Sequence, residues 1–458
     1  MLMPFSEIKS RAKALFRISA PVMAEQTFVM LMGIVSSILV AHIGEHAVSA
    51  VSMVDSISML LISFFMALAT GGTIVIAQYT GRQEMRKAKT AAGQAFVMSI
   101  VLAFTLLIVF IFMGETIINA MFRDAEPKVS DAAYRFLSII IFSYPFLAAN
   151  QTAFGIMRGS GNTRTPMFIS ILMNIINLVL GVILIRGLNL PFVTIPAFGV
   201  AGAAVALLVG RVSGFLLAMY HLTRRAKTMR LDKIKYFLPN LAAVKNILRF
   251  GIPSGVESSL FNLGKLLTMT FVVGLGTHAI AANAVGGMLL GITNIVASSF
   301  SVGIMVMCGK MVGAGETHDI KRTAHFAAVT ASVLMALIGL VMFVLFNPIV
   351  SLYNVEADTI RYLRQILYTA FIVQIFLWPG SFLVPSVLRA AGDVKFTMLA
   401  SIISMWALRI GLAYVFGVTL GFGLIGVWMG MFADWLGRGI LFYRRLHSNK
   451  WMGKAIKD

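Results

Sequence analysis

Charged residues and cysteine are both scarce in this sequence, and each scarcity excludes a class of protein. Only 12% of the residues are charged, while 59% are hydrophobic and the mean hydropathy is +0.88. A soluble domain usually has about a quarter of its residues charged. The single cysteine, Cys308, excludes a disulfide within the chain and a metal site built from several cysteines. The composition therefore predicts an integral membrane protein.

The sequence also lacks the motifs of membrane-embedded enzymes. It contains no His-Glu-x-x-His zinc motif, no serine and histidine pairing that can be placed within a span, and no metal cluster. We therefore expect a protein that is not an enzyme, and we expect no cofactor and no resident metal ion. An intramembrane enzyme is kept only as a remote alternative.

Twelve apolar segments are long enough to cross a bilayer, which takes about 20 residues per helix. Backbone groups in hydrocarbon have no water to bond, and runs of this length are too continuous for barrel strands. We therefore expect an all-α membrane protein with twelve transmembrane helices in two pseudo-symmetric six-helix bundles. The predicted spans lie near residues 16–42, 51–78, 92–118, 133–157, 165–187, 198–221, 250–275, 279–308, 322–346, 361–387, 396–418 and 423–443.

Lysine and arginine are unevenly distributed over the predicted loops. With the N-terminus inside, 28 of the 38 basic residues fall in cytoplasmic segments, 6 in outer loops and 4 within spans. This bias predicts a multi-pass protein of a prokaryotic cytoplasmic (inner) membrane with both termini cytoplasmic. The net charge of +20 is dispersed over short loops and lacks interleaved aromatic residues, so we expect no nucleic-acid partner. We expect a monomer in the lipid bilayer.

The longest cytoplasmic loop divides the predicted chain into two lobes. We expect an N-lobe at 1–221, a basic linker at 222–249, a C-lobe at 250–445 and a cytoplasmic tail at 446–458. The linker is predicted to contain a helix that lies on the membrane surface. Because each half has an even number of spans, the lobes should be related by a pseudo-two-fold axis along the membrane normal, with a cavity between them. This design is typical of a transporter.

The two halves also repeat one another in sequence. A shift of 232 positions places Pro21-x-x-x-Glu25 on Pro253-x-x-x-Glu257. A shift of 231 places the Arg-x-x-Gly motif at 158–161 on the one at 389–392. Each half therefore carries a carboxylate four residues after a proline, at the same depth of its first span.

Acidic residues within spans need a partner or a function, because an ionised group is costly in hydrocarbon. Glu257 has no basic residue within one helical turn, and an unpaired carboxyl group in a low-dielectric bundle can gain and lose a proton near neutral pH. We interpret Glu257 as a cation-coupling residue; the alternative is a protonated side chain that only bonds a neighbouring helix. Glu25 and Asp55 are further candidates, although Glu25 could reach solvent or a loop arginine and Asp55 could bond locally. Asp434, one turn before Arg438, is predicted to form a structural ion pair.

Polar side chains in the spans are candidates for the walls of a substrate cavity. Asn174 and Asn177 are three residues apart and face the same side of a helix. Hydrogen bonding between helices is the alternative for the amides. The candidate cavity residues are Asn150, Gln151, Asn174, Asn177, Asn262, Lys265, Asn283, Gln374 and Arg409.

Taken together, these features resemble the multidrug and toxic compound extrusion (MATE) transporters of the multidrug/oligosaccharidyl-lipid/polysaccharide flippase superfamily. The resemblance covers residues 20 to about 445, and its motifs include Arg158-Gly-Ser-Gly-Asn-Thr-Arg-Thr-Pro166 and the stretches at 69–72, 78–81 and 423–428. It implies antiport: small organic compounds, cationic or amphipathic drugs or metabolites, leave in exchange for H⁺ or Na⁺ by alternating access. It also implies that Glu257 matches the coupling glutamate of the C-lobe.

The sequence departs from this resemblance at three positions. Family members that couple through the N-lobe carry aspartates where this chain has Ser36 and Gly181, and an aspartate expected near Gln374 is absent. We count Ser36 among the candidate cavity residues. A single carboxyl group favours H⁺ as the coupling ion, but Asn262 or backbone carbonyls could complete a shell for Na⁺ at Glu257.

A flippase for a lipid-linked precursor or polysaccharide is the alternative with the same architecture. Such a protein would need a cationic cavity for a pyrophosphate group, and Lys265 and Arg409 are the candidates away from the cytoplasmic edge. Drug resistance and turnover of the lipid precursor, measured side by side, would separate the two functions.

Overall fold

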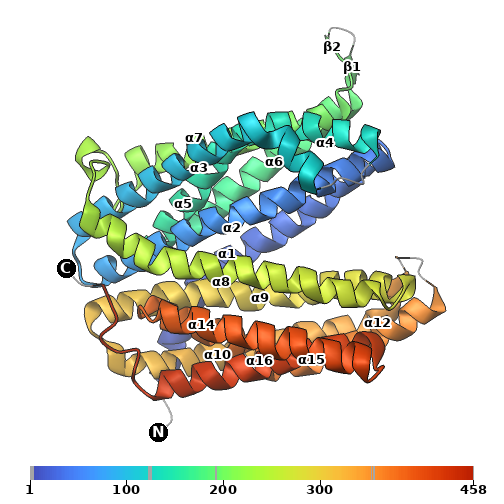
Figure 1. Ribbon diagram of the computed structural model, residues 1–458. Coiled ribbons are helices and arrows are strands. Elements are labelled where there is room, and N and C mark those ends of the chain that lie inside the picture. Colours follow the sequence, from blue (N-terminus) through green and yellow to red (C-terminus); the bar gives the residue numbers. More distant parts are fainter. Residues whose placement is uncertain (1–4, 122–125, 191–192, 352, 354–355, 457–458) are drawn as a thin grey trace. The chain divides into compact units, whose positions relative to one another are not determined.

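The protein folds into two units of long helices that run side by side within each unit (Figure 1). The computed structural model describes residues 5–121, 126–190, 193–351, 353 and 356–456. The N-unit comprises residues 24–80 and 84–255, and the C-unit comprises residues 1–23, 81–83 and 256–458. This division follows packing, so the first turns of the chain group with the C-unit.

Both halves of the sequence consist mainly of long helices. The first half contains α1 (Phe5–Ala41), α2 (Glu45–Gly81), α3 (Met85–Met121), α4 (Pro127–Ile140), η1 (Ile141–Ser143), α5 (Tyr144–Ser160), α6 (Arg164–Arg186), α7 (Gly199–Tyr220) and η2 (His221–Arg225). The second contains η3 (Ile234–Tyr236), α8 (Leu241–Val273), α9 (Thr277–Ala314), η4 (Thr317–Asp319), α10 (Ile320–Val344), α11 (Phe346–Ser351), α12 (Ala357–Trp378), η5 (Pro379–Leu383), α13 (Val384–Ala390), α14 (Val394–Ser404), η6 (Met405–Ile410), α15 (Gly411–Tyr414), η7 (Val415–Thr419) and α16 (Gly423–His447).

These segments account for the twelve predicted spans. In the part of the chain that the structure describes, 11 helical stretches are long and apolar enough to cross a membrane. The remaining predicted span corresponds to α8, a helix of 33 residues. Its apolar stretch contains Glu257, Asn262 and Lys265, which lower its hydropathy. The polar residues that set α8 apart are also those singled out for function.

Prolines lie where the regular hydrogen bonding of the long helices is interrupted. Pro21 lies inside α1 and Pro253 inside α8, and each removes the hydrogen bond to the carbonyl one turn earlier. The span that begins with α12 passes through the π-helical η5, which starts at Pro379, into α13. The span that begins with α4 passes through η1 into α5, whose second residue is Pro145. Glu25 and Glu257 therefore each lie one turn after a proline that interrupts the hydrogen bonding of its helix.

Two loops contain short elements that were not predicted. The all-α class is confirmed, and β1 (Leu188–Leu190) and β2 (Val193–Ile195) add only a short antiparallel hairpin in the loop between α6 and α7. Leu188 pairs with Ile195, so residues with high strand propensity lie in the ladder. The stretch at 222–249 was expected to contain a surface helix; its described helical residues belong to η2, to the three-residue turn η3 and to the first part of α8, from Leu241.

Glycines allow close helix packing at equivalent places in the two halves. The Gly-x-x-Gly motif at 199–202 recurs at 423–426. A Cβ atom on Gly202 would lie 2.5 Å from the carbonyl oxygen of Leu184 on α6, and a Cβ on Gly426 would lie 2.5 Å from the backbone of Phe416 on η7. Backbones approach closely where small residues face each other. Both motifs therefore lie where two helices are in close contact.

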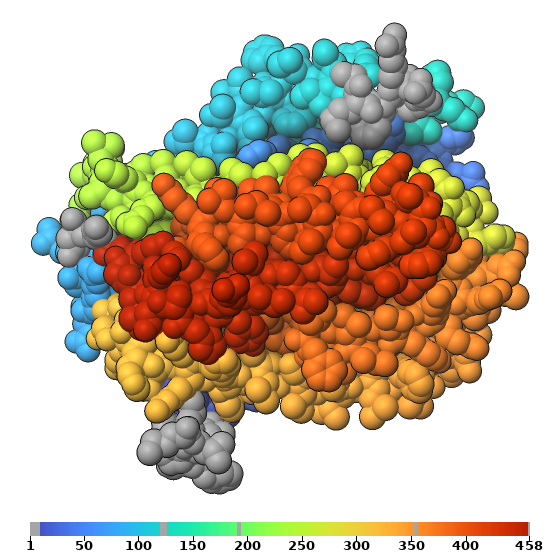
Figure 2. Space-filling view, turned by 60° about the horizontal axis from the view of Figure 1, so that its bottom comes forward, coloured from blue at the N-terminus to red at the C-terminus, as the bar shows by residue number. Residues whose placement is uncertain are grey.

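The residues that follow α16 pack against the end of α13. Asp393 is 1% exposed and accepts hydrogen bonds from Arg445 Nε and Lys454 Nζ, both at 2.6 Å. Trp451 is also 1% exposed, and its indole N–H donates to the carbonyl of Leu446 at 2.8 Å. In Figures 1 and 2 this segment lies beside the neighbouring helices of the C-unit. The segment predicted as a cytoplasmic tail is therefore packed against the C-unit over its described residues.

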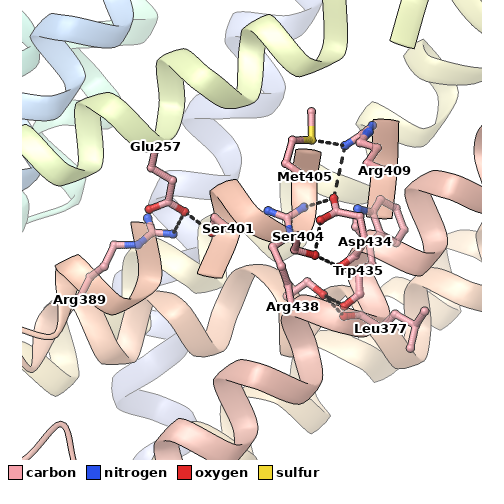
Figure 3. A network of polar contacts seen from close by, with 11 residues as sticks. Glu257, Leu377, Arg389, Ser401, Ser404, Met405, Arg409, Asp434, Trp435 and Arg438 are labelled. Carbon is pink, nitrogen blue, oxygen red and sulfur yellow. Dashed lines mark hydrogen bonds and ion pairs between the residues drawn. The ribbon is translucent and has the colours of Figure 1, made fainter. Parts of the chain in front are cut away.

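The interior of the C-unit contains a charged network centred on Asp434, which is 0% exposed (Figure 3). Arg438 Nη2 donates to Asp434 Oδ2 at 2.6 Å, and Ser404 Oγ donates to Oδ1 at 2.8 Å. Arg409 Nη1 lies 3.8 Å from Oδ2. The predicted pair between Asp434 and Arg438 is confirmed. The contacts of Asp434 with Ser404 and Arg409 join α16 to α14 and η6.

We expect Asp434→Asn to lower the stability of the C-unit by roughly 3–5 kcal/mol, because the change leaves buried guanidinium groups without their counter-charge. The matched change Asp358→Asn, in the exposed first turn of α12, should cost less than about 1 kcal/mol. Thermal unfolding of the detergent-solubilised protein measures both effects. Equal Tm values for the two variants would contradict this role of Asp434.

Candidate functional site

The first candidate carboxylate, Glu25, forms a two-oxygen ion pair within the N-unit. Arg158 Nη2 donates to Glu25 Oε1 at 2.7 Å and to Oε2 at 2.8 Å. The side chain of Glu25 is 8% exposed and that of Arg158 is 15% exposed. Arg158 lies in the last turn of α5, which ends at Gly161 with a left-handed φ of 96°. Of the alternatives for Glu25, the structure therefore supports a contact with an arginine.

The second candidate, Glu257, has a similar partner in the C-unit but a looser contact (Figure 3). Arg389 Nη2 lies 3.4 Å from Glu257 Oε1, and Ser401 Oγ donates to the same oxygen at 2.7 Å. Among the residues that the structure describes, Glu257 Oε2 is buried and has no hydrogen-bond partner. One oxygen of this carboxylate is therefore held by two side chains, and the other is buried without a hydrogen-bond donor from the described part of the chain.

The expectation that Glu257 is unpaired was wrong, for a simple reason of geometry. Only basic residues within one turn of α8 had been considered as partners, whereas Arg389 lies on α13, 132 positions further along the chain. The sequence contained a usable signal. Glu25 and Glu257 are related by the 232-residue shift, and Arg158 and Arg389 by the 231-residue shift, so both members of each pair occur in the repeat.

The N-unit contains a cavity of about 440 Å³, which we call the N-cavity. Its lining comes from α1, α2, α4, α6 and α7, and Asp55 is the one charged residue among the lining residues. Of the candidate residues, Ser36, Asn174 and Asn177 lie in this wall, as does Gly181. Asn174 Nδ2 also donates to the carbonyl of Ser170 at 2.8 Å, so part of its bonding is local.

The C-unit contains a second cavity, of about 490 Å³, which we call the C-cavity. Of the candidate residues, Lys265, Asn283 and Arg409 line it. Asn283 Oδ1 accepts a hydrogen bond from the indole N–H of Trp428 at 3.0 Å. The aromatic lining was missed from the sequence, because nothing in the order of residues separates an aromatic side chain facing a cavity from one facing lipid. These aromatic residues are Phe261, Trp378, Phe382, Trp428 and Trp435.

Four candidate cavity residues lie outside the walls of these two cavities. Asn150 is 2% exposed and donates to the carbonyl of Arg211 at 2.9 Å. Gln374 is fully buried and accepts from Thr293 Oγ1 at 2.8 Å. Asn150 and Gln374 therefore form hydrogen bonds between helices, which was the alternative to a place in a cavity wall. Gln151 and Asn262 are half-buried.

The described residues contain no group of three or more histidine, cysteine, aspartate or glutamate side chains arranged to hold a metal ion. The candidate residues form two separate sets, with one carboxylate–arginine pair and one cavity in each unit. Glu257 and Phe261 lie one turn apart on α8, so the C-unit pair and the C-cavity share a helix.

The sequence model of the MatE family matches residues 21–183 and 253–415, two ranges that are again related by a shift of 232. The transporter YisQ of Bacillus subtilis, itself uncharacterized, is 27% identical over 446 residues, covering 97% of this chain and 96% of the relative. A probable multidrug resistance protein NorM of Thermotoga maritima is 25% identical over 455 residues, covering 99% and 96%.

Solved structures of the same fold are also similar over nearly the whole chain. A MATE transporter from Vibrio cholerae has a TM-score of 0.88 at 20% identity, covering 97% of this chain and 99% of the other. A MOP superfamily transporter from Pyrococcus furiosus, whose binding pocket is described as having reverse polarity, has a TM-score of 0.87 at 21% identity, covering 96% of each. The family match over both halves, together with the helical fold, shows that this chain belongs to the MatE family and is a multi-pass membrane transporter, not an enzyme.

Proposed function

We propose that this protein is an efflux antiporter that exports cationic or amphipathic organic compounds in exchange for H⁺ or Na⁺ by alternating access. The names of two relatives from Thermotoga maritima and Oceanobacillus iheyensis, both probable multidrug resistance proteins, support this class of cargo. The excess of lysine and arginine in the predicted inner loops supports an orientation with both termini in the cytoplasm.

The observation that carries the proposal is the half-satisfied carboxylate of Glu257. Its side chain is 12% exposed, and Arg389 approaches only one of its oxygens, at 3.4 Å. A buried carboxylate is stabilised by a close counter-charge or by protonation. The partner in this pair is distant enough for a proton or a cation at Oε2 to compete with it. Glu25 is less available, because Arg158 contacts both of its oxygens.

Movement of α8 would connect this carboxylate to the cargo. The helix carries Glu257 and, one turn later, Phe261 in the wall of the C-cavity. Neutralising Glu257 weakens its attraction to Arg389 on α13, so the ion-bound and ion-free states favour different positions of α8. Cargo that favours one of these positions is linked to the ion by a reciprocal coupling free energy, typically about 1–3 kcal/mol.

The N-cavity is the proposed binding site for cationic cargo. Asp55 supplies its charge, and Ser36, Asn174 and Asn177 supply polar groups in an otherwise mainly apolar wall. A cavity with apolar walls and a few polar groups is the usual form of a small-molecule site. The family resemblance had placed a carboxylate at the positions of Ser36 and Gly181, and Asp55 lines the same cavity as both.

We expect Glu257→Gln to reduce gradient-driven efflux by roughly ten-fold or more, because an amide cannot alternate between a charged and a neutral form. Efflux of a fluorescent cationic dye from proteoliposomes is measured under an imposed pH gradient and, separately, under an imposed sodium gradient. The gradient that drives efflux in the unchanged protein identifies the coupling ion. Glu316→Gln, on an exposed carboxyl group, is the control and should leave efflux unchanged. Full efflux by Glu257→Gln would remove this residue from the mechanism.

We expect Asp55→Asn to raise the Kd for tetraphenylphosphonium, an amphipathic cation, by roughly ten-fold, because the N-cavity loses its negative charge. Equilibrium binding to the detergent-solubilised protein measures this. Ser37→Ala is the matched control in the same wall, since the Ser37 hydroxyl is bonded to the carbonyl of Gly33 in its own helix at 3.0 Å. An unchanged Kd in Asp55→Asn would exclude the N-cavity as the cation site.

A further inference from the structure

The charges in and behind the wall of the C-cavity do not balance. Lys265 and Arg409 line the cavity, and Arg438 lies behind Arg409 on the same carboxylate, Asp434. None of the residues lining the cavity is acidic. Within the described residues, Lys265 has no carboxylate within 4 Å. Three cationic groups therefore face one carboxylate, which leaves an excess of positive charge: Arg409 and Arg438 are buried, and Lys265 is exposed at the cavity.

The three cations gather around one aromatic ring. Lys265 Nζ lies 5.3 Å from the ring centroid of Phe261, Arg409 Cζ lies 5.5 Å away and Arg438 Cζ lies 5.3 Å away. Contact with the face of an aromatic ring stabilises a cation by about 0.5–2 kcal/mol. The ring is neutral, however, so it softens the repulsion among the three groups without supplying a counter-charge.

Hydrogen-bond donors are also in excess here. Within the part of the chain that the structure describes, Arg409 Nε and the indole N–H of Trp435 are buried and have no acceptor. Both side chains belong to the lining of the C-cavity (Figure 3 shows them near Asp434). Buried donors normally have partners, so a surplus of them next to a cationic cavity favours a ligand that brings acceptor oxygens.

The remaining wall of the C-cavity is aromatic. The rings of Trp378 and Phe382 stack with their centroids 4.8 Å apart, and Phe382 meets Trp435 edge to face at 6.0 Å. Trp428 adds a further ring on the α16 side. Such walls favour a planar aromatic body, because ring pairs gain energy beyond the burial of their area. The N-cavity differs, since its only charged lining residue is acidic.

We propose that the C-cavity binds organic anions that carry an aromatic ring, with the anionic group at Lys265 and Arg409 and the ring among the tryptophans. The cargo would then include anions or zwitterions in addition to the cations assigned to the N-cavity. The role of such an anion as cargo rests on the proposed function. Its binding rests on the cavity alone, so it is measured without any gradient.

A series of probes that share one ring system tests the charge preference. Naphthalene carboxylate, its neutral carboxamide and naphthalene methylammonium are titrated into the detergent-solubilised full-length Asp55→Asn variant, in which the N-cavity has lost its negative charge, and heats of binding are recorded. The carboxylate should bind at least about ten-fold more tightly than the amide and the ammonium compound. Equal or tighter binding of the ammonium compound would overturn the proposal. If inorganic phosphate at equal concentration displaced the carboxylate probe, the inference that the ligand carries an aromatic ring would be wrong.

Variants of Lys265 locate the binding site. Lys265→Gln should raise the Kd of the carboxylate probe by roughly ten-fold and leave the carboxamide unaffected, while Lys265→Arg should retain affinity. Lys395→Gln, which removes an exposed lysine outside the cavity, is the matched control. Carboxylate binding that is the same in Lys265→Gln and Lys395→Gln would overturn the assignment. Efflux and anion binding test the two proposals separately. Efflux that is unchanged in Glu257→Gln would contradict ion coupling at Glu257, whereas anion binding that is unchanged in Lys265→Gln would contradict the anion site in the C-cavity.

Discussion

A carboxylate bound to an arginine from a later helix is the interaction on which both halves of this protein depend. Each half places its glutamate one turn after a proline in its first long helix, and its arginine near the end of the fourth predicted span. In an apolar interior neither charge is stable alone, so each pair joins two helices. The duplication of the pair gives both units the same internal connection.

The two copies of this connection differ in geometry. Glu25 is bound through both oxygens, at 2.7 and 2.8 Å, which suits a fixed contact. Glu257 is approached at 3.4 Å through one oxygen, which it shares with Ser401. The cavities differ as well, with an acidic N-cavity and a cationic, aromatic C-cavity. A duplicated fold has thus kept its framework while the chemistry of its two halves has diverged.

Most of the fold could be predicted from the sequence, because a bilayer imposes helices on long apolar runs and the internal repeat fixes their grouping. The pair between Asp434 and Arg438 was predictable because it is local, one turn along a single helix. The contact between Glu257 and Arg389 was not found, since it depends on tertiary packing between α8 and α13. The hairpin at Leu188–Ile195 was missed because three-residue strands leave almost no periodicity. The aromatic wall of the C-cavity depends on which way each side chain faces, which composition does not reveal.

The spacing of the ion pairs along the chain also bears on how the protein is made. Helices enter a membrane in order from the amino end, so Glu25 on α1 precedes its partner Arg158 by 133 residues, and Glu257 precedes Arg389 by 132. Asp434 and Arg438 are only four residues apart and arrive together. During synthesis each glutamate must therefore remain neutral, or sheltered by the insertion machinery, until three more spans have followed it. This delay between a glutamate and its arginine partner occurs twice, once in each half of the chain.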